Sequence, residues 1–516
     1  MDSAWTSHPK PRRLTRQAIW RLGWMSLYSG LLGGVLYTAF SHWGYDDPFI
    51  TYRYADNLAR GLGFVYNPGE RVLSTTTPFF TLLLAGLSHL WPDIPRLANL
   101  IGALSIPVGG LFIWDLAQSW ETPAAGWAGL LLYPLFPLLL MTQSSETPLY
   151  LACCLGAYAC YARRKYTWTA TLAALAVLTR PDGVLVPVLL AAGFTLGPAG
   201  FSGASGIPPR VSGWRQRLSA IPWPAVLVFL SLTLAWFIFA WSYFGTPIPA
   251  TLAAKQHQGA MAISERFGPG FSTILRWYSA RHYQFMAGLA ILGLVYALAR
   301  RRAWLLILAW PALYFTAYSI LGVSRYFWYY APLVPGFIVG VGLGISALAG
   351  LLGMVAGKRS ARLSYLPSIL AGCLLAGLIF TLRGSLLRLP QQPDNRLAIY
   401  QAVGNWLAAN TAPGSSVGTL EVGIIGYYAR RPMIDFAGLI QPQIAAQLGA
   451  RTGFEDSALW AASYYQPDYL VLLENAFPGL ERRYVEGRCR LSETFTGAGY
   501  GYPGNLRVYA CQEHAQ

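Results

Sequence analysis

Charged residues are scarce in this sequence: they form 12% of the 516 residues, whereas hydrophobic residues form 54%. The mean hydropathy is +0.38. Charge is absent from repeated stretches of about 17–25 residues, which is the length that a helix needs to cross a membrane. This pattern excludes an ordinary soluble domain and predicts an α-helical protein that crosses the bilayer many times.

Cysteine and histidine are also scarce, with six of each. The sequence has no Cys-x-x-Cys motif and no cysteine–histidine spacing typical of a zinc site. Four cysteines lie in apolar stretches, where burial as small hydrophobic side chains is the simpler interpretation. A signal-peptide cleavage site is not evident either, so we expect the basic N-terminus to lead directly into a first span.

Nucleic acid is excluded as a partner in spite of the net charge of +16, because the basic residues cluster in short loops between apolar stretches. A nucleic-acid-binding protein would instead gather them on one face. Basic loops between spans are typical of the cytoplasmic side of a membrane protein. The clusters are Lys10–Arg13, Arg163–Lys165, Arg210–Arg217, Arg300–Arg302 and Lys358–Arg362.

The alternation of apolar stretches and basic clusters predicts about eleven spans within residues 1–382, with the N-terminus in the cytoplasm. Two long loops, residues 44–78 and 245–283, then lie outside, and residues 78–91 are expected to form a re-entrant or surface helix. The predicted spans cover residues 22–40, 95–116, 124–141, 149–161, 168–178 and 224–244, with one more starting after residue 183 and others ending at residues 300, 321, 358 and 382.

From residue 383 onward the composition changes, and no stretch is long and apolar enough to span a membrane. Strand-like pieces (SSVGTL, PDYLVLLE, NLRVYAC) alternate with turn residues and with an amphipathic helix over residues 397–409. Residues 383–516 are therefore predicted to form a soluble α/β domain, large enough to bury its own core. An odd number of spans places this domain outside the cell.

Cys489 and Cys511 flank a segment rich in Gly, Tyr, Pro and Asn, and both of its arms alternate as hairpin strands do. Folding the hairpin about its turn would bring the two cysteines within the Cα separation that a disulfide requires. We therefore predict a disulfide between them.

The segment GYDDPFITYRYADNLARGLGFVYNPGERVLSTTTP (residues 44–78) carries two adjacent acids, and we call it the Asp-Asp loop. Pro48 suits the first position of a helix, so Asp47 is expected to be its N-cap, with the helix ending at Gly61 or Gly63. Asp46 is then left without a structural role. Adjacent like charges raise one pKa, which suits a general base, and Asp46 is the preferred candidate.

The Asp-Asp loop resembles the first exterior loop of bacterial GT-C membrane glycosyltransferases, in particular the AftB-like arabinofuranosyltransferases. Further matching pieces follow in the same order: Thr179–Gly183, Gly245–Pro249, Ser324–Tyr326, Gly426–Tyr428 and Asp435–Leu439. The resemblance implies transfer of a sugar from a polyprenyl-phosphate donor to a glycan, lipid or protein acceptor. It places the reaction on the outer face of the bacterial plasma (inner) membrane. It also implies that Asp46 or Asp47 is the base.

A phosphate leaving group needs cations to meet its developing charge. Lys255 is one of only four lysines and lies in the second long loop, and Arg325 follows a span end. Both are predicted to bind the donor phosphate. His257, Tyr326 and Arg53 are further candidates for substrate binding, although a structural role suits Arg53 better.

Alternatives remain open at this point. The acidic pair could hold a divalent cation (Mg²⁺, Mn²⁺ or Ca²⁺) against the donor phosphate, although no complete set of oxygen ligands is evident. Arg180 and Asp182 could form a local ion pair in a turn rather than a catalytic group. A transporter or lipid flippase would also have many spans, but the two halves of the chain are not alike and the acids do not lie mid-membrane. A sugar-binding membrane protein without activity is the third interpretation.

Overall fold

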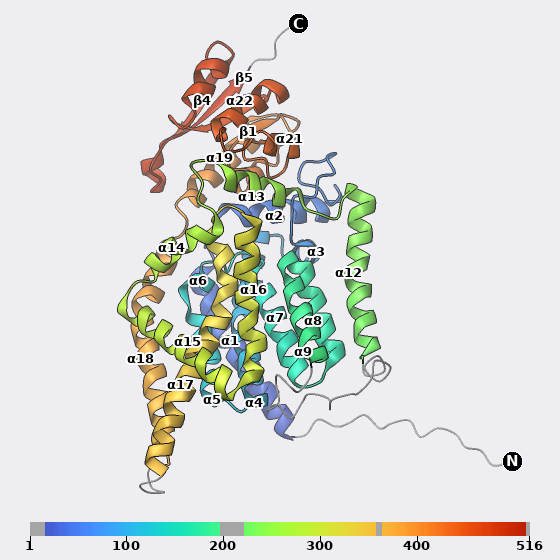
Figure 1. Cartoon of the computed structure of the whole chain (residues 1–516). Helices are drawn as coiled ribbons and strands as arrows, with labels where there is room; N and C mark the ends of the chain where they lie inside the picture. The colour runs from blue at the N-terminus through green and yellow to red at the C-terminus, as the bar shows by residue number, and fades with distance from the viewer. Residues whose placement is uncertain (1–15, 197–220, 358–363, 512–516) are drawn as a thin grey trace, which may run out of the picture.

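The computed structural model describes residues 16–196, 221–357 and 364–511 of the chain. The basic clusters Lys10–Arg13, Arg210–Arg217 and Lys358–Arg362 lie outside these residues. The described helices form an upright bundle, and a small domain containing a β-sheet lies on one end of it (Figure 1). The protein is an α-helical multi-pass membrane protein with a small C-terminal sheet domain.

Within the described ranges, six helical stretches are long and apolar enough to cross a membrane: Ile94–Ser119, Trp223–Phe244, Arg281–Arg300, Arg302–Leu321, Phe327–Val355 and Leu366–Asn410. Shorter apolar helices stand beside them, so the number of eleven spans stays a prediction. The bundle helices are α1 (Arg16–Phe40), α4 (Ile94–Ser119), α5 (Pro123–Leu131), α7 (Thr147–Ala162), α8 (Tyr166–Thr179), α9 (Leu185–Leu196), α12 (Trp223–Phe244), α15 (Arg281–Arg300), α16 (Leu305–Leu321), α17 (Val334–Gly357) and α18 (Leu366–Arg388).

The predicted span over residues 124–141 is not one helix. It divides into α5, a 3₁₀ turn η1 (Tyr133–Leu135) and a short helix α6 (Pro137–Leu140). Proline disfavours helical geometry in the residue before it, and Phe136 accordingly has φ −77° and ψ 120°. Pro134 and Pro137 thus interrupt the helix within the predicted span, and whether residues 124–141 cross the membrane stays a prediction.

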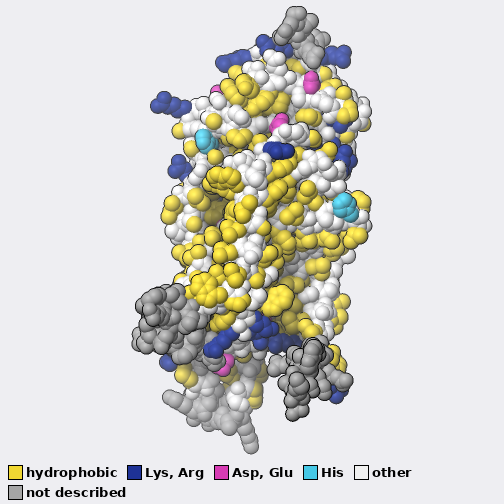
Figure 2. Space-filling model, turned by 90° about the vertical axis from the view of Figure 1, so that its right-hand side faces the viewer, with side chains coloured by type: hydrophobic (Ala, Val, Ile, Leu, Met, Phe, Trp, Pro, Cys, Tyr) yellow, Lys and Arg dark blue, Asp and Glu magenta, His cyan; other side chains and the backbone are white. Residues whose placement is uncertain are grey.

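Side-chain chemistry divides the molecule along its length. Figure 2 shows hydrophobic side chains over the middle of the visible face, with Lys and Arg above and below them. At the end opposite the C-terminal domain, Arg163 Nε lies 2.5 Å from Asp115 Oδ2, and Arg21 also pairs with Asp115. The described basic clusters, residues 163–165 and 300–302, lie at this same end (Figure 1).

The C-terminal domain contains, in its described residues, a five-stranded sheet of order β2-β1-β3-β5-β4. The first three strands are parallel and the last two run antiparallel to their neighbours. The strands are β1 (Val417–Thr419), β2 (Met433–Asp435), β3 (Tyr469–Leu473), β4 (Cys489–Phe495) and β5 (Leu506–Cys511). The helices are α19 (Arg396–Asn410), α20 (Ile424–Ala429), α21 (Pro442–Ala445), α22 (Phe454–Tyr465) and α23 (Pro478–Leu480).

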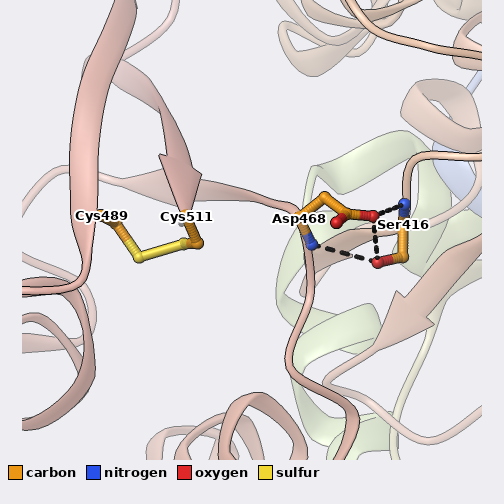
Figure 3. Close-up of a disulfide and its surroundings, with 4 residues drawn as sticks. All are labelled: Ser416, Asp468, Cys489 and Cys511. Carbon is orange, nitrogen blue, oxygen red and sulfur yellow. Dashed lines mark hydrogen bonds between the residues drawn. A yellow bond between two sulfur atoms is a disulfide. The ribbon is translucent and has the colours of Figure 1, made fainter. Parts of the chain in front are cut away.

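A disulfide and a group of hydrogen bonds hold the outer edge of this sheet together (Figure 3). Cys489 and Cys511 face each other in the β4–β5 register and are joined by a disulfide. Ser416 precedes β1 and donates from its backbone N and its Oγ to Asp468 Oδ2, at 2.7 and 2.9 Å. Asp468 N in turn donates to Ser416 Oγ at 3.1 Å. These bonds join the starts of β1 and β3. Because the two strands are parallel, both end at the opposite edge of the sheet.

Four helices lie between or beside the bundle and the C-terminal domain (Figure 1). They are α2 (Asp46–Ala59), α3 (Pro78–Ser88), α13 (Ala250–Ala260) and α14 (Phe267–Trp277). Helix α2 is the helix predicted in the Asp-Asp loop, and Gly61 and Gly63 follow it with φ of 76° and 97°. Apolar side chains of α2, α19 and α20 share one buried cluster, including Phe49, Val403 and Ile425. The Asp-Asp loop therefore belongs to the packing of the C-terminal domain as well as to the bundle.

Candidate active site

Asp47 and Lys255 meet between α2 and α13. Asp47 Oδ2 lies 3.5 Å from Lys255 Nζ, and the Asp47 side chain is 29% exposed whereas that of Lys255 is 6% exposed. Lys255 Nζ also lies 3.7 Å from the ring centroid of Tyr326. Burial alone lowers the pKa of Lys255, but Asp47 and Tyr326 outweigh it and the net pKa is raised. The site thus holds a permanent, enclosed positive charge beside a partly exposed carboxylate.

The structure gives a structural role to Asp46 and not the N-cap role that was predicted for Asp47. Helix α2 begins at Asp46, and its N-cap residue Tyr45 makes no capping side-chain bond among the described residues. Asp46 is buried, and its two carboxylate oxygens accept hydrogen bonds from Gly423 N at 3.0 Å and Ile424 N at 2.8 Å. The predictions that Asp47 caps the helix and that Asp46 has no structural role were therefore wrong.

Asp46 holds the first turn of α20 against α2. Burial raises the pKa of Asp46 and the nearby Glu421 adds to this, while the Ile424 amide and Arg396 lower the pKa. Its oxygens are occupied by backbone amides, so Asp46 is poorly placed to take a proton from a substrate. Asp47 is the better candidate for the base.

Sequence reasoning missed two further acids near Asp47. Glu146 precedes α7, and Glu421 follows β1 in the C-terminal domain. Burial raises the pKa of each of these carboxyls, and the charge of Asp47 adds to both shifts. Neither acid belongs to a recognisable motif. The one feature of the sequence that could have indicated them is that each is a lone acid in a short segment between apolar stretches.

Arg180 neutralises one of these acids. Its Nε lies 3.0 Å from Asp182 Oδ1, so the local ion pair predicted from the sequence is confirmed. Its Nη1 also reaches Glu146 Oε1 at 3.1 Å, and its Nη2 donates to the hydroxyl of Tyr318 at 3.2 Å. Arg180 is buried and links α7, α8 and α16 at the end of the bundle where α2 lies.

Arg325 was predicted to bind the donor phosphate together with Lys255. In the structure Arg325 Nε lies 2.6 Å from Glu265 Oε2, and Arg325 N donates to Glu265 O at 2.7 Å. Both cations have a carboxylate neighbour, but Arg325 lies closer to Glu265 than Lys255 lies to Asp47, at 2.6 Å against 3.5 Å. Phosphate binding by Arg325 stays a prediction.

Arg53 is enclosed between the Asp-Asp loop and the C-terminal domain. It is 1% exposed and donates to the carbonyl oxygens of Gly426 at 2.8 Å and of Tyr66 and Arg431 at 3.3 Å. Its guanidinium satisfies backbone acceptors rather than facing a cavity. These contacts give Arg53 the structural role that the sequence favoured, and substrate binding by Arg53 stays a prediction.

His257 lies in α13 with Lys255, and Tyr326 lies under the Lys255 ammonium. His257 Nδ1 donates to Leu448 O of the C-terminal domain at 2.9 Å, which gives it a structural contact. Tyr326 OH donates to Gln258 Oε1 at 2.9 Å, and its ring stacks on Trp328 with centroids 4.6 Å apart. These contacts orient the ring under the Lys255 ammonium. Substrate binding by either residue stays a prediction.

Asp46 and Asp47 were predicted to be able to hold a divalent cation against the donor phosphate. Among the described residues, no group of three or more His, Cys, Asp and Glu side chains could hold a metal ion. Asp46 also has both oxygens occupied by the amides of α20. Use of Mg²⁺, Mn²⁺ or Ca²⁺ stays a prediction.

The chain is similar in structure, over 95% or more of its length, to two solved proteins. ArnT from Cupriavidus metallidurans, bound to undecaprenyl phosphate, has a TM-score of 0.58 at 16% identity over 95% of this chain and 98% of that chain. The archaeal oligosaccharyltransferase AglB from Archaeoglobus fulgidus, in complex with an inhibitory peptide and a dolichol-phosphate, has a TM-score of 0.59 at 14% identity. That match covers 96% of this chain and 75% of AglB.

Identities this low show the fold alone, and the chain has the GT-C fold. Residues 391–509 match the family described as Domain of unknown function (DUF8728). No curated protein matches the chain.

Proposed function

We propose that this protein is a membrane glycosyltransferase that moves a sugar from a polyprenyl-phosphate donor to a hydroxyl-bearing acceptor. The observation that supports this most directly is the position of the Asp47 carboxylate. It is partly exposed, lies 3.5 Å from the Lys255 ammonium, and is at the end of the bundle under the C-terminal domain. This pair brings into one site the two kinds of group that displacement of a sugar from a phosphate needs, a base for the acceptor proton and a cation for the leaving phosphate.

In this mechanism the acceptor oxygen attacks the anomeric carbon and its proton passes to Asp47. The bond between that carbon and the phosphate oxygen breaks, and the electron pair leaves with the phosphate. Lys255 meets the developing negative charge. Attack opposite the leaving group inverts the anomeric centre. Tyr326 and Asp47 keep Lys255 protonated and fixed in place.

The known neighbours support the choice of donor. ArnT was solved with undecaprenyl phosphate and AglB with a dolichol-phosphate, and this chain shares their fold over 95% or more of its length. The AftB-like resemblance makes arabinofuranose the first donor sugar to test. The acceptor is proposed to be a glycan, lipid or protein.

The orientation follows from charge. The described basic loops lie at the end of the bundle opposite Asp47, and basic loops favour the cytoplasm. We therefore place the site and the C-terminal domain on the exterior face of a bacterial plasma membrane, with the N-terminus inside.

The test is donor consumption by the purified full-length protein. It is incubated with polyprenyl-phosphate arabinofuranose and with hexose analogues, and loss of donor and release of polyprenyl phosphate are measured by mass spectrometry. A transferase consumes the donor, and Asp47→Asn abolishes that consumption. In liposomes, a flippase or transporter would move the donor across the bilayer unchanged, which would contradict the proposal.

A further inference from the structure

Glu421 lies just past the end of β1, at the edge of the sheet that faces the bundle. β1 has β2 on one side and β3 on the other, so the order of the strands reverses direction at β1. Open α/β sheets bind ligands outside the strand ends at such a point. Gly423 N donates to Asp46 at this edge, and Ala437 O accepts from Gln258 of α13 at 3.0 Å. A ligand here would contact the C-terminal domain and the bundle together.

The position of Glu421 relative to Asp47 is fixed by the backbone contact between their neighbours. Asp46 is next to Asp47, and Gly423 is two residues after Glu421. A Cβ on residue 423 would lie 2.0 Å from Asp46 O, so the two backbones touch. Burial raises the pKa of Glu421, the neighbouring Arg396 lowers it, and the charge of Asp47 raises it further.

Glu421 has a carboxylate oxygen that is free, among the described residues, to accept further hydrogen bonds from a ligand, whereas both oxygens of Asp46 already accept from backbone amides. In the described part of the chain its hydrogen-bond partner is Arg396 alone, with Nη1 3.3 Å from Glu421 Oε1. Arg396 does not depend on this bond, because Asp394 already accepts from its Nε at 2.9 Å and its Nη2 at 2.6 Å. The Glu421 side chain is 31% exposed. A carboxylate in this state is suited to a ligand that donates hydrogen bonds.

We propose that Glu421 binds the acceptor, taking a hydrogen bond from one hydroxyl of a polyhydroxylated end such as a sugar, so that a neighbouring hydroxyl points at Asp47. This inference rests on the proposed function and extends it to the acceptor. A carboxylate accepts hydrogen bonds and repels anions, so the acceptor group that Glu421 would bind is a hydroxyl rather than a phosphate or a carboxylate. The C-terminal domain thereby completes the acceptor subsite.

The experiment measures transfer by the full-length protein with radiolabelled polyprenyl-phosphate arabinofuranose and glucose as donor probes and octyl glycosides as acceptor probes. Glu421→Gln is expected to raise the acceptor KM by about 10- to 100-fold, the loss expected for a hydrogen bond to a charged group. The donor KM and the slow transfer to water stay within about twofold. Glu421→Asp keeps the charge and restores part of the acceptor affinity.

The matched control is Glu474→Gln. Glu474 is also a partly exposed glutamate of the C-terminal domain paired with an arginine, Arg507, and its side chain is 25% exposed. This variant is expected to leave both KM values unchanged. An unchanged acceptor KM in Glu421→Gln, or equal loss of transfer to acceptor and to water, would overturn the inference alone. Absence of any donor consumption by the unmodified protein would contradict the proposed function and the inference with it.

Discussion

Asp46 and Gly423 are in direct contact although they are 377 residues apart in the chain: Asp46 Oδ2 accepts a hydrogen bond from Gly423 N at 3.0 Å. The carbonyl oxygen of Asp46 lies so close that a side chain on residue 423 has no room. This contact docks the C-terminal domain onto the Asp-Asp loop and sets the positions of Asp47 and Glu421 on either side of it.

Gly423→Ala should separate the two surfaces. The added Cβ would lie 2.0 Å from a backbone oxygen, which cannot rotate away, so the domain has to shift at a cost of about 1–3 kcal/mol. We expect a lower melting temperature and reduced transfer. Gly414→Ala is the control in the same domain, because no described atom lies within 4 Å of the point that its added Cβ would occupy. Equal melting temperatures and activities in both variants would refute the docking role.

Asp47→Asn should abolish transfer, by about 10²- to 10⁴-fold, because the amide cannot take the acceptor proton. Asp46→Asn should instead cost about 1–3 kcal/mol of stability, since one amide of α20 loses its acceptor in a buried contact. Activity and thermal melts of both purified variants are compared. Full activity in Asp47→Asn would exclude it as the base, and loss confined to Asp46→Asn would restore the sequence-based assignment.

Lys255→Met should raise the donor KM by about tenfold or more, because the variant keeps an apolar stem but loses the charge that meets the phosphate. Arg325→Met should have a smaller effect, since Arg325 is held at 2.6 Å by Glu265 whereas Lys255 lies 3.5 Å from Asp47 and is freer to meet a phosphate. Lys165→Met, at the opposite end of the bundle, serves as the control. The donor KM and kcat of the three variants are measured. Unchanged values in Lys255→Met would show that Lys255 does not bind the donor phosphate.

The disulfide between Cys489 and Cys511 should be detectable by alkylation, since the chain has six cysteines and two are joined. The denatured, unreduced protein is expected to gain the mass of four alkyl groups, and of six after reduction. Reduction should also lower the stability of the C-terminal domain by about 3 kcal/mol, the value for a loop of this size. Alkylation of all six cysteines without reductant would show that the bridge does not form.

Features that depend on neighbouring residues could be predicted from the sequence. Apolar stretches indicated the bundle, and the turn-rich segment between Cys489 and Cys511 indicated a hairpin whose strands are now β4 and β5. Helix α2 and its glycine-rich end followed from Pro48, Gly61 and Gly63. These signals are local: the spacing of side chains and backbone preference act within a few residues, so they can be read without the fold.

The distribution of roles within the site was decided by tertiary structure. Asp46 and Asp47 are adjacent and chemically identical, and only the arrival of Gly423 from the C-terminal domain buries one and leaves the other beside Lys255. Glu421 became a candidate in the same way. Burial and hydrogen bonding depend on which distant backbone groups reach a side chain, and no local pattern in a sequence records that.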